Sequence, residues 1–546
     1  MFIRTVKNSS GQKYQQVVES YRNEEGKVRQ RVLLSLGKAE DGNAEKLLAV
    51  LAKNQNKLIA MDLADSVSVS ETFILGPLLM LAAVFESAGV NDILSQIQSQ
   101  HEKLELDLKK IIFTLVVSRF VNPCSKLKTF EHWQHRFFSK MLTEEIQLHQ
   151  MYRALDLLAE NKLEIEKFFY WMDRNLLNLK TEVVLYDLTT LRFESTNETE
   201  DLRRFGYSKE KRSDCTQIVF GLLLNTEGIP LGFDVYPGST CESTTIEKIV
   251  DKVKTKFSIE RIILVADRGL FSAKNLELLR KNKGEFIVGH KLGSMSKEEK
   301  ETAYDITKFS WIIQDELAIL EKRTPAGDRL IITWSRSRAI RDEKTRSDII
   351  KKIELKLAKG KNSGKKFVSN TNYKKYLNGL EQSAPVLNQE AIIAENKKDG
   401  FFGIVTNIET MSANEIVTNY KQLWKIEDAF GEIKGTLKTR PVFHWTDSRI
   451  IGHLVLCFIS YYCEAIITKK LREKNTILKR PSAEAKIIKK RPLTVVEALK
   501  DLVEVRAIPV KIQNQTYWVR TDITGNAAAI LTAIGAKIPP RTLLVE

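Results

Sequence analysis

Cysteine is scarce in this chain, and the few cysteines are not arranged in pairs. Among its 546 residues there are five, which are Cys124, Cys215, Cys241, Cys457 and Cys463, and no two of them form a CxxC motif. An odd and scattered set argues against a disulfide framework and fits a reducing compartment. We therefore expect a cytoplasmic protein.

Long uninterrupted apolar runs are also few. The first fifteen residues, MFIRTVKNSSGQKYQ, lack the apolar run of a signal peptide. The longest apolar run, residues 450–467, approaches the length of a membrane span, but it contains His453 and Glu464 and follows Arg449. Polar and ionisable side chains in such a run favour a buried core helix over a membrane span. We expect no membrane partner.

Acidic residues are outnumbered by basic ones. The chain has 69 Asp and Glu against 85 Lys and Arg, which gives a net charge of +16 and a pI near 9.3. A surplus of this size favours an acidic partner, most often nucleic acid, although a merely soluble basic protein is the alternative. The length implies roughly two to four domains.

The first part of the chain divides into two segments of different character. Residues 1–40 alternate apolar and polar side chains around an Asn-Glu-Glu-Gly turn, which predicts a β-hairpin unit. Arg29 and Arg31 in this unit either contact DNA or lie on a solvated edge. Residues 41–180 show apolar spacing near 3.6 and predict a helical domain that is a candidate for DNA binding.

The pattern changes to strands at residue 181. Three strand-like runs are followed by helix, strand, helix and strand, which is the order of an RNase H-like core over residues 181–290. Residues 291–400 interrupt this core as a β-rich insertion. Residues 401–470 return to the core with a last strand and a helix, and residues 471–546 form a small C-terminal α/β region. The predicted fold class is therefore α/β, with an RNase H-like mixed sheet.

Two aspartates end apolar, strand-like runs of the predicted core. Asp187 ends VVLYD and Asp267 ends IILVAD. In an RNase H-like topology these strands are neighbours, so the two carboxylates should lie together at one edge of the sheet. The alternative for each aspartate is a capping or turn residue.

A third carboxylate comes from the stretch YKQLWKIEDAFGEIK, residues 420–434, which we interpret as one helix. Tyr420, Glu427 and Lys434 are spaced seven residues apart, so they would share one helix face. A phenol, a carboxylate and a cation on one face suit a metal ion and a phosphate group. Asp428 and Glu432 should point elsewhere. The alternative is a solvated helix face.

Together the three acids suit cleavage of phosphodiester bonds in DNA. Hard divalent cations take oxygen ligands, and two such ions about 4 Å apart activate the attacking oxygen and stabilise the leaving one. We expect Asp187, Asp267 and Glu427 to be both the catalytic residues and the ligands of two Mg²⁺ ions, with Mn²⁺ able to substitute.

On these residues the chain resembles the DDE transposases of cut-and-paste insertion sequences that carry a YREK signature. Tyr420, Glu427 and Lys434 occupy the tyrosine, glutamate and lysine positions of that signature, whereas Leu423 stands at the arginine position. The flanking segments also look similar, among them YDLTT, GYSKEKRSDCTQIVFGLLL, IPLGFDVYPGST, ADRGLFS and RPVFHWTDSRIIGHL. The resemblance covers roughly residues 180 to 460.

The resemblance implies nicking at transposon ends followed by strand transfer into target DNA. Its partners would be double-stranded DNA, at the transposon ends and the target, and a second copy of the chain, since two ends must be cut together. Tyr420 and Lys434 would contact phosphates, and Lys421 or Lys425 would replace the missing arginine. Arg268 would reach DNA or pair with an acid. In a prokaryote such a protein would associate with the nucleoid.

Several alternatives stay open at this point. Trp311 and Trp334 in the insertion are either core residues or a platform for a flipped base of a hairpin intermediate. An RNase H-like nuclease without strand transfer would share the three acids. A catalytically inactive, DNA-binding repressor would keep the fold, and Leu423 keeps that interpretation in view.

Overall fold

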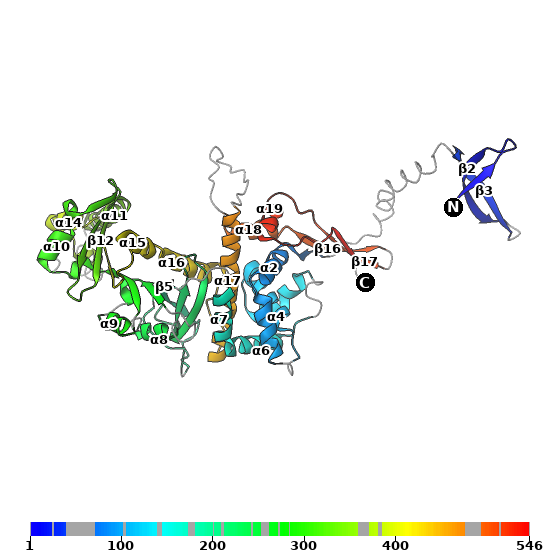
Figure 1. Ribbon diagram of the computed structural model, residues 1–546. Coiled ribbons are helices and arrows are strands. Elements are labelled where there is room, and N and C mark those ends of the chain that lie inside the picture. The colour runs from blue at the N-terminus through cyan, green and yellow to red at the C-terminus, as the bar shows by residue number, and fades with distance from the viewer. Residues whose placement is uncertain are drawn as a thin grey trace. The chain divides into compact units, whose positions relative to one another are not determined.

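The computed structural model describes residues 2–23, 27–39, 71–101, 105–138, 145–172, 181–199, 201–208, 212–241, 244–252, 261–270, 273–282, 284–358, 371–379, 385–474, 493–512 and 515–544. These residues form two compact units (Figure 1). One unit is drawn from residues 1–73, 506–522 and 539–546, and the other from residues 74–505 and 523–538.

The first unit begins with an antiparallel sheet that has three strands in its described part. The strands are β1 (Phe2–Lys7), β2 (Lys13–Arg22) and β3 (Val28–Lys38). The hairpin predicted from the sequence corresponds to β2 and β3, and β1 adds a strand that the prediction lacked. Arg29 and Arg31 are exposed, and Arg31 forms an ion pair of 2.6 Å with Glu19.

The remaining strands of the first unit come from the C-terminal region. They are β16 (Arg506–Ile512), β17 (Gln515–Arg520) and β18 (Thr542–Leu544), and β17 pairs antiparallel with both of the others. The short strand β4 (Phe73–Ile74) lies at the boundary of the two units in the chain.

The second unit begins with helices. They are α2 (Gly76–Ser87), α3 (Val90–Ser99), α4 (Leu108–Val121), α5 (Lys126–Lys128), η2 (Thr129–Trp133), η3 (Gln134–Arg136), α6 (Leu148–Glu160) and α7 (Lys162–Met172). Near its C-terminal end the same unit contains α18 (Val495–Leu502) and α19 (Gly525–Ile534).

The apolar run near residue 450 forms the central helix α17 (Asp447–Glu473), against which α6 packs closely. Gly452 permits this approach, because a Cβ atom there would lie 2.0 Å from the carbonyl oxygen of Leu155. By length and composition alone α17 could cross a membrane, but 83% of its most apolar window is buried inside the protein. Burial of this kind is typical of a core helix.

The centre of the second unit is a mixed sheet with nine strands in the described residues, in the order β10-β11-β12-β15-β9-β8-β5-β6-β7. The five strands of this sheet that come first in the chain are β5 (Thr181–Arg192), β6 (Gln217–Leu224), β7 (Pro230–Pro237), β8 (Arg261–Ala266) and β9 (Glu285–His290). β5, β6 and β7 form an antiparallel meander, and β8 and β9 add parallel to β5. The predicted RNase H-like core is therefore confirmed.

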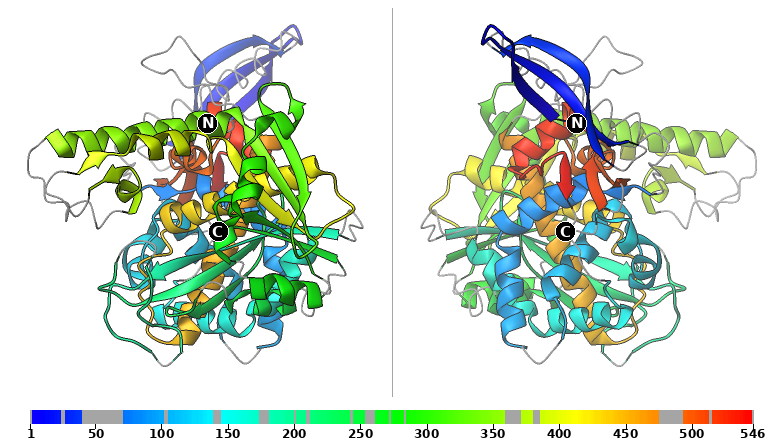
Figure 2. Two further views of the ribbon diagram at one scale, coloured as in Figure 1. Left: turned by 90° about the vertical axis from the view of Figure 1, so that its left-hand side faces the viewer. Right: turned by 90° about the vertical axis from the view of Figure 1, so that its right-hand side faces the viewer.

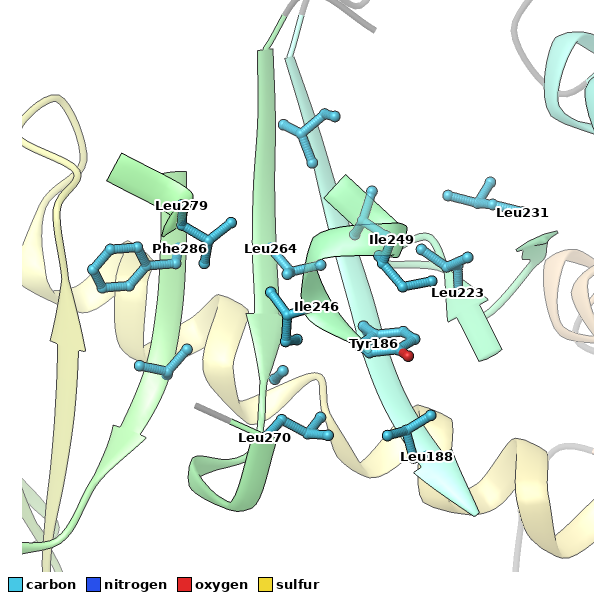
Figure 3. Packing of buried hydrophobic residues seen from close by; sticks show 14 of the residues in the cluster. Tyr186, Leu188, Leu223, Leu231, Ile246, Ile249, Leu264, Leu270, Leu279 and Phe286 are labelled. Carbon is cyan, nitrogen blue, oxygen red and sulfur yellow. The ribbon is translucent and has the colours of Figure 1, made fainter. Parts of the chain in front are cut away.

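One face of this sheet is covered by α8 (Ile246–Asp251) and α9 (Ala273–Lys281), which lie between the strands in the chain. Tyr186, Leu264 and Phe286 point toward this face and pack with side chains of the two helices (Figure 3). Because side chains alternate along a strand, the residue after Tyr186 faces the opposite side. That residue is Asp187.

The insertion extends the core sheet. β10 (Ser310–Ile313), β11 (Leu317–Arg323) and β12 (Arg329–Ser335) continue it in antiparallel order, and β15 (Phe401–Thr406) joins β12 to β9. The long helix α11 (Arg336–Ala358) then leaves the end of this sheet (Figure 2). The smaller elements are η8 (Leu292–Ser294), α10 (Lys297–Ala303), η9 (Ile306–Lys308), α13 (Thr371–Lys374), β13 (Leu377–Asn378), β14 (Val386–Leu387) and α14 (Gln389–Asn396).

Candidate active site

The stretch predicted as one helix is divided into three pieces. α15 (Ala413–Lys421) ends before a turn at Gln422 and Leu423, α16 (Trp424–Gly431) follows, and the π-helical segment η10 (Glu432–Thr436) continues it. At the turn, Lys425 N–H bonds to Gln422 O at 2.9 Å and Ile426 N–H to Leu423 O at 3.1 Å. These bonds span three residues instead of four and change the helical phase. The single-helix prediction is therefore wrong.

The two aspartates come from neighbouring parallel strands. In the register of β5 and β8, Tyr186 pairs with Ala266, so Asp187 and Asp267 each follow a paired residue by one position. Asp187 accepts a bond from the Leu188 backbone N–H at 2.7 Å. Asp267 follows β8 directly and is exposed. The register thus places the two aspartates at neighbouring positions of adjacent strands, as predicted. Asp187, however, lies within β5, which continues to Arg192, and does not end its strand as the sequence suggested.

Tyr420 connects α15 to this edge. Its hydroxyl donates to Asp267 Oδ1 at 3.4 Å, and its ring packs on Phe402 with 5.1 Å between centroids. Burial first, and then the neighbouring Asp267 carboxylate, raises the pKa of Tyr420. The hydroxyl therefore keeps its proton and remains a donor. It reaches Asp267 across β9 because Gly289 has no side chain, as a Cβ there would lie 2.6 Å from the Tyr420 hydroxyl oxygen.

All three predicted acids line a single cleft of about 640 Å³. Asp187 and Asp267 line it from the sheet, the exposed Glu427 lines it from α16, and Tyr420 and Lys421 line it from α15. Of the other predicted site residues, Lys434 lies on η10 and Arg268 begins the short helix η7 (Arg268–Leu270) beside Asp267. Neither belongs to the described lining of the cleft. The shared face expected for Tyr420, Glu427 and Lys434 therefore holds only for the first two.

The insertion contributes residues that the sequence did not single out. Arg338 and Arg341 of α11 line the cleft, as do Thr333, Ser335 and Ser337 just before them. The Arg338 guanidinium lies 4.5 Å from the centre of the Phe402 ring. Burial, more than any other cause, lowers its pKa. The basic character of this helix was visible in the sequence, but its position was not, because the position follows from the pairing of β12 with β15.

The arginine position of the YREK signature is part of the same cleft. Leu423 lines it and contributes no charge, while Lys421 lines it as an exposed cation. Lys425 points elsewhere and donates to the carbonyl oxygen of Thr226. Of the two lysines considered as replacements, only Lys421 therefore faces the cleft, and Arg338 provides a guanidinium from a different element.

Asp428 and Glu432 face away from the cleft, as predicted. They line a separate cavity with Tyr461 and Glu464 of α17. Burial, and to a smaller extent repulsion from Glu432 and Asp428, raises the pKa of Glu464 to about 7, against the lowering effect of the hydrogen bond from Thr468. α16 thus presents Glu427 to the cleft and Asp428 to the separate cavity, and η10 adds Glu432 to that cavity.

The donor chemistry of the cleft suits a hard cation, since three carboxylates supply only oxygen ligands. In the part of the chain that the structure describes, no three carboxylate, imidazole or thiol side chains converge closely enough to hold a metal ion. The fold therefore gathers the acids into one cleft without drawing them into a compact ligand set. A cation between them would offset their mutual repulsion.

The mixed sheet and α16 thus bring three acids to one cleft, and carboxylate-rich two-metal sites occur in polymerases and nucleases. The model of the transposase DDE domain matches residues 178–463, which is more than half of the chain. The model of the N-terminal domain of IS1634 family transposases matches residues 3–62. The chain belongs to the DDE transposases of insertion sequences.

The protein is thus a DNA transposase, as the sequence indicated. Membership of this family implies DNA as a partner and dependence on a divalent metal. Among solved structures, the chain is similar to one in the cryo-EM structure of the piggyBac transposase synaptic complex with hairpin DNA. The two chains share 10% sequence identity and superimpose with a TM-score of 0.35, over 78% of this chain and 79% of that one. Comparison with curated proteins gives no match.

Proposed function

We propose that Asp187, Asp267 and Glu427 hold two Mg²⁺ ions, for which Mn²⁺ can substitute, and that the cleft cuts transposon ends and joins them to target DNA. The observation that carries this proposal is the lining of one cleft by acids from β5, β8 and α16. When bound, the two ions activate the attacking oxygen and stabilise the leaving oxygen.

The other side chains of the cleft position the reacting groups. Tyr420 holds the Asp267 carboxylate through its hydroxyl, which leaves the second carboxylate oxygen available. Lys421 and Arg338 supply positive charge for the DNA backbone, and a guanidinium suits bidentate phosphate binding. In this arrangement Arg338 takes over the phosphate contact that Leu423 cannot make. Arg268 and Lys434 would contact DNA outside the cleft.

The direct test is cleavage of labelled DNA carrying the ends of the element, with Mg²⁺ or Mn²⁺, by wild type and Glu427→Gln. The variant keeps the shape of the side chain and removes its charge, so we expect cleavage to fall at least about 100-fold, the scale on which loss of a catalytic group acts. Removal of the metal with a chelator should abolish cleavage by the wild type, and added Mn²⁺ should restore it. Binding of the same DNA should survive the Glu427 substitution.

Glu432→Gln is the matched control, because Glu432 lies on the next turn and faces the separate cavity. Equal activity of both variants would refute the assignment of Glu427. Product analysis then separates two functions: joined products establish strand transfer, whereas cut ends alone would indicate a nuclease. Absence of both with intact DNA binding would favour a repressor.

We also propose that two copies of the chain act together. Two ends must be cut in a coordinated way, and the described part of one chain holds a single cleft lined by all three acids. Light scattering of the protein with end DNA should give the mass of a homodimer with two duplexes, and a complex with one protein chain per duplex would refute this.

A further inference from the structure

A second polar cavity lies apart from the three acids, between α4, α5, α6, α17 and the loop that follows η10. It has a volume of about 150 Å³, several times the ~30 Å³ that a water molecule occupies in the liquid. Its basic lining consists of Arg119, Lys126, Lys438, Arg440, His444 and His453, which we call the basic pocket. Among the described residues that line it, none is acidic.

The innermost cations of the basic pocket are deeply buried. Arg119 is 6% exposed and Lys126 is 4% exposed. The Arg119 guanidinium donates to the carbonyl oxygens of Leu437 and Lys438, both at 3.1 Å, so it orders the loop that forms the rim. Within the described chain, neither Arg119 nor Lys126 forms an ion pair with a carboxylate. Buried charges in proteins are normally paired, so this pair of cations lacks the usual partner.

The histidines do not supply the missing negative charge. Lys126 Nζ lies 2.7 Å from His453 Nδ1, and His453 Nε2 lies 3.2 Å from Thr439 O. This geometry fits a neutral imidazole that accepts from Lys126 and donates to the carbonyl. Burial first, and then Lys126 and Arg119, lowers the pKa of His444 to about 3 and holds that of His453 well below its usual value.

Burial and neighbouring positive charge also lower the pKa of Lys126. Burial first, and then Arg119, holds the pKa of Lys126 well below its usual value. An anion in the basic pocket would oppose both causes, because it would pair with the ammonium and replace its lost hydration. The pocket thus has the charge, the donors and the space for one small oxyanion.

We propose that the basic pocket binds a phosphate group of the DNA backbone. This inference rests on the proposed function, since it assigns part of the DNA path to this surface. The rim supports a polymer over a free ion: Lys438 is exposed, and the side chain of Phe443 is 64% exposed at the mouth. An exposed aromatic beside a phosphate site suits stacking on a base or sugar.

The pocket is connected to the catalytic strand. The Val442 backbone N–H, in the loop that forms the rim, bonds to Arg192 O at the end of β5, at 3.2 Å. Asp187 lies five residues earlier on that strand, which is roughly 16 Å along it. The rim of the pocket is thus hydrogen-bonded to the end of the strand that carries Asp187.

The test uses the full chain and a labelled duplex of arbitrary sequence, without divalent metal so that no cleavage occurs. Affinity is measured over a range of salt concentrations for wild type, Lys126→Gln and Lys128→Gln. Lys128 is the matched control because it is exposed, lies two residues away and does not line the pocket. In parallel, thermal unfolding is followed with inorganic phosphate added to each protein.

We expect Lys126→Gln to weaken DNA binding about ten-fold, the scale of one charge-assisted bond, and to reduce the salt slope by about one. Lys128→Gln should change the slope less. Inorganic phosphate should stabilise wild type and Lys128→Gln but not Lys126→Gln.

Other outcomes overturn the assignment. An unchanged salt slope in Lys126→Gln, with phosphate still stabilising the wild type, would mean that the pocket takes a free anion only. No stabilisation by phosphate in any protein, with an unchanged slope, would mean that it is not an anion site. Wild type that binds no DNA at all would instead refute the proposed function. An unfolding midpoint of Lys126→Gln close to that of wild type shows that the variant is folded.

Discussion

The contact between Gly289 and Tyr420 gives the sharpest prediction about the cleft. A Cβ atom at position 289 would lie 2.6 Å from the Tyr420 hydroxyl oxygen, but 3.4 Å from both the Tyr420 Cζ and the Phe402 Cζ. The last two are ordinary contacts, so Gly289→Ala conflicts with the hydroxyl alone. The hydroxyl must therefore move by several tenths of an ångström or more.

That movement breaks the bond from Tyr420 to Asp267, which is already 3.4 Å long. Hydrogen bonds to charged groups contribute about 1.5–3 kcal/mol, and the length of this one places it near the lower value. A loss of about 1.4 kcal/mol in the transition state is ten-fold in rate. We expect Gly289→Ala to cut DNA about ten-fold more slowly than wild type.

The assay is a double-mutant cycle on the cleavage rate. Tyr420→Phe removes the hydroxyl and should also cost about ten-fold. In Gly289→Ala with Tyr420→Phe the methyl group meets no hydroxyl, so the double variant should be no slower than Tyr420→Phe alone. Gly293→Ala is the control, because no atom lies within 4 Å of a Cβ there.

Two results would refute this reasoning. Full activity of Gly289→Ala would mean that Tyr420 does not position Asp267. Additive losses in the double variant would mean that the methyl group acts through the strand and not through the hydroxyl, since independent sites add and coupled ones do not. Urea unfolding of each variant separates these effects from a loss of stability.

Two further predictions concern stability, measured as the free energy of unfolding in urea. The pKa of Glu464 is raised to about 7, chiefly by burial, so the folded state holds its proton where the unfolded state, with a pKa of about 4.3, has lost it. Wild type should therefore lose on the order of 3 kcal/mol as the pH rises from 4 to 8, and Glu464→Gln should lose less. An equal loss in the two proteins would contradict this, and the exposed Glu473→Gln is the control. Gly452→Ala should destabilise by at least about 1–3 kcal/mol, because its Cβ would lie 2.0 Å from the backbone oxygen of Leu155 and would separate α17 from α6. Gly431→Ala, where a Cβ meets no atom within 4 Å, should by contrast stabilise α16 slightly, and similar effects of the two changes would disprove the account of the helix contact.

The order of elements and the identity of the family could be obtained from the sequence. Apolar runs of strand length recur between helical segments, and Asp187 and Asp267 stand where such runs end. These signals are local, since each depends on a few adjacent residues, and the strand order then follows from a small set of allowed topologies. Glu427 was identified because its spacing from Tyr420 matches a known signature.

The tertiary structure decided which other groups reach the cleft. Tyr420 and Glu427 line the cleft from either side of the turn at Gln422 and Leu423, whereas Lys434 lies on the π-helical segment η10 and does not line it. The pairing of β15 with β9 and β12 extends the core sheet, and the helix α11 that follows β12 contributes Arg338 to the cleft. Periodicity cannot give these results, because they depend on contacts between distant segments.

The basic pocket is the clearest example of a site that sequence patterns could not predict. Lys126 and His453 are in contact although 327 positions separate them in the chain. In the sequence, His453 is one polar residue in an apolar run, and Arg119 is one basic residue near the end of another. The net charge of +16 favours an acidic partner but does not say where on the protein it binds. Only the packing of α4, α5 and α17 placed buried cations together with no carboxylate among the described residues that line the pocket, because burial and the pairing of charges are properties of the folded chain.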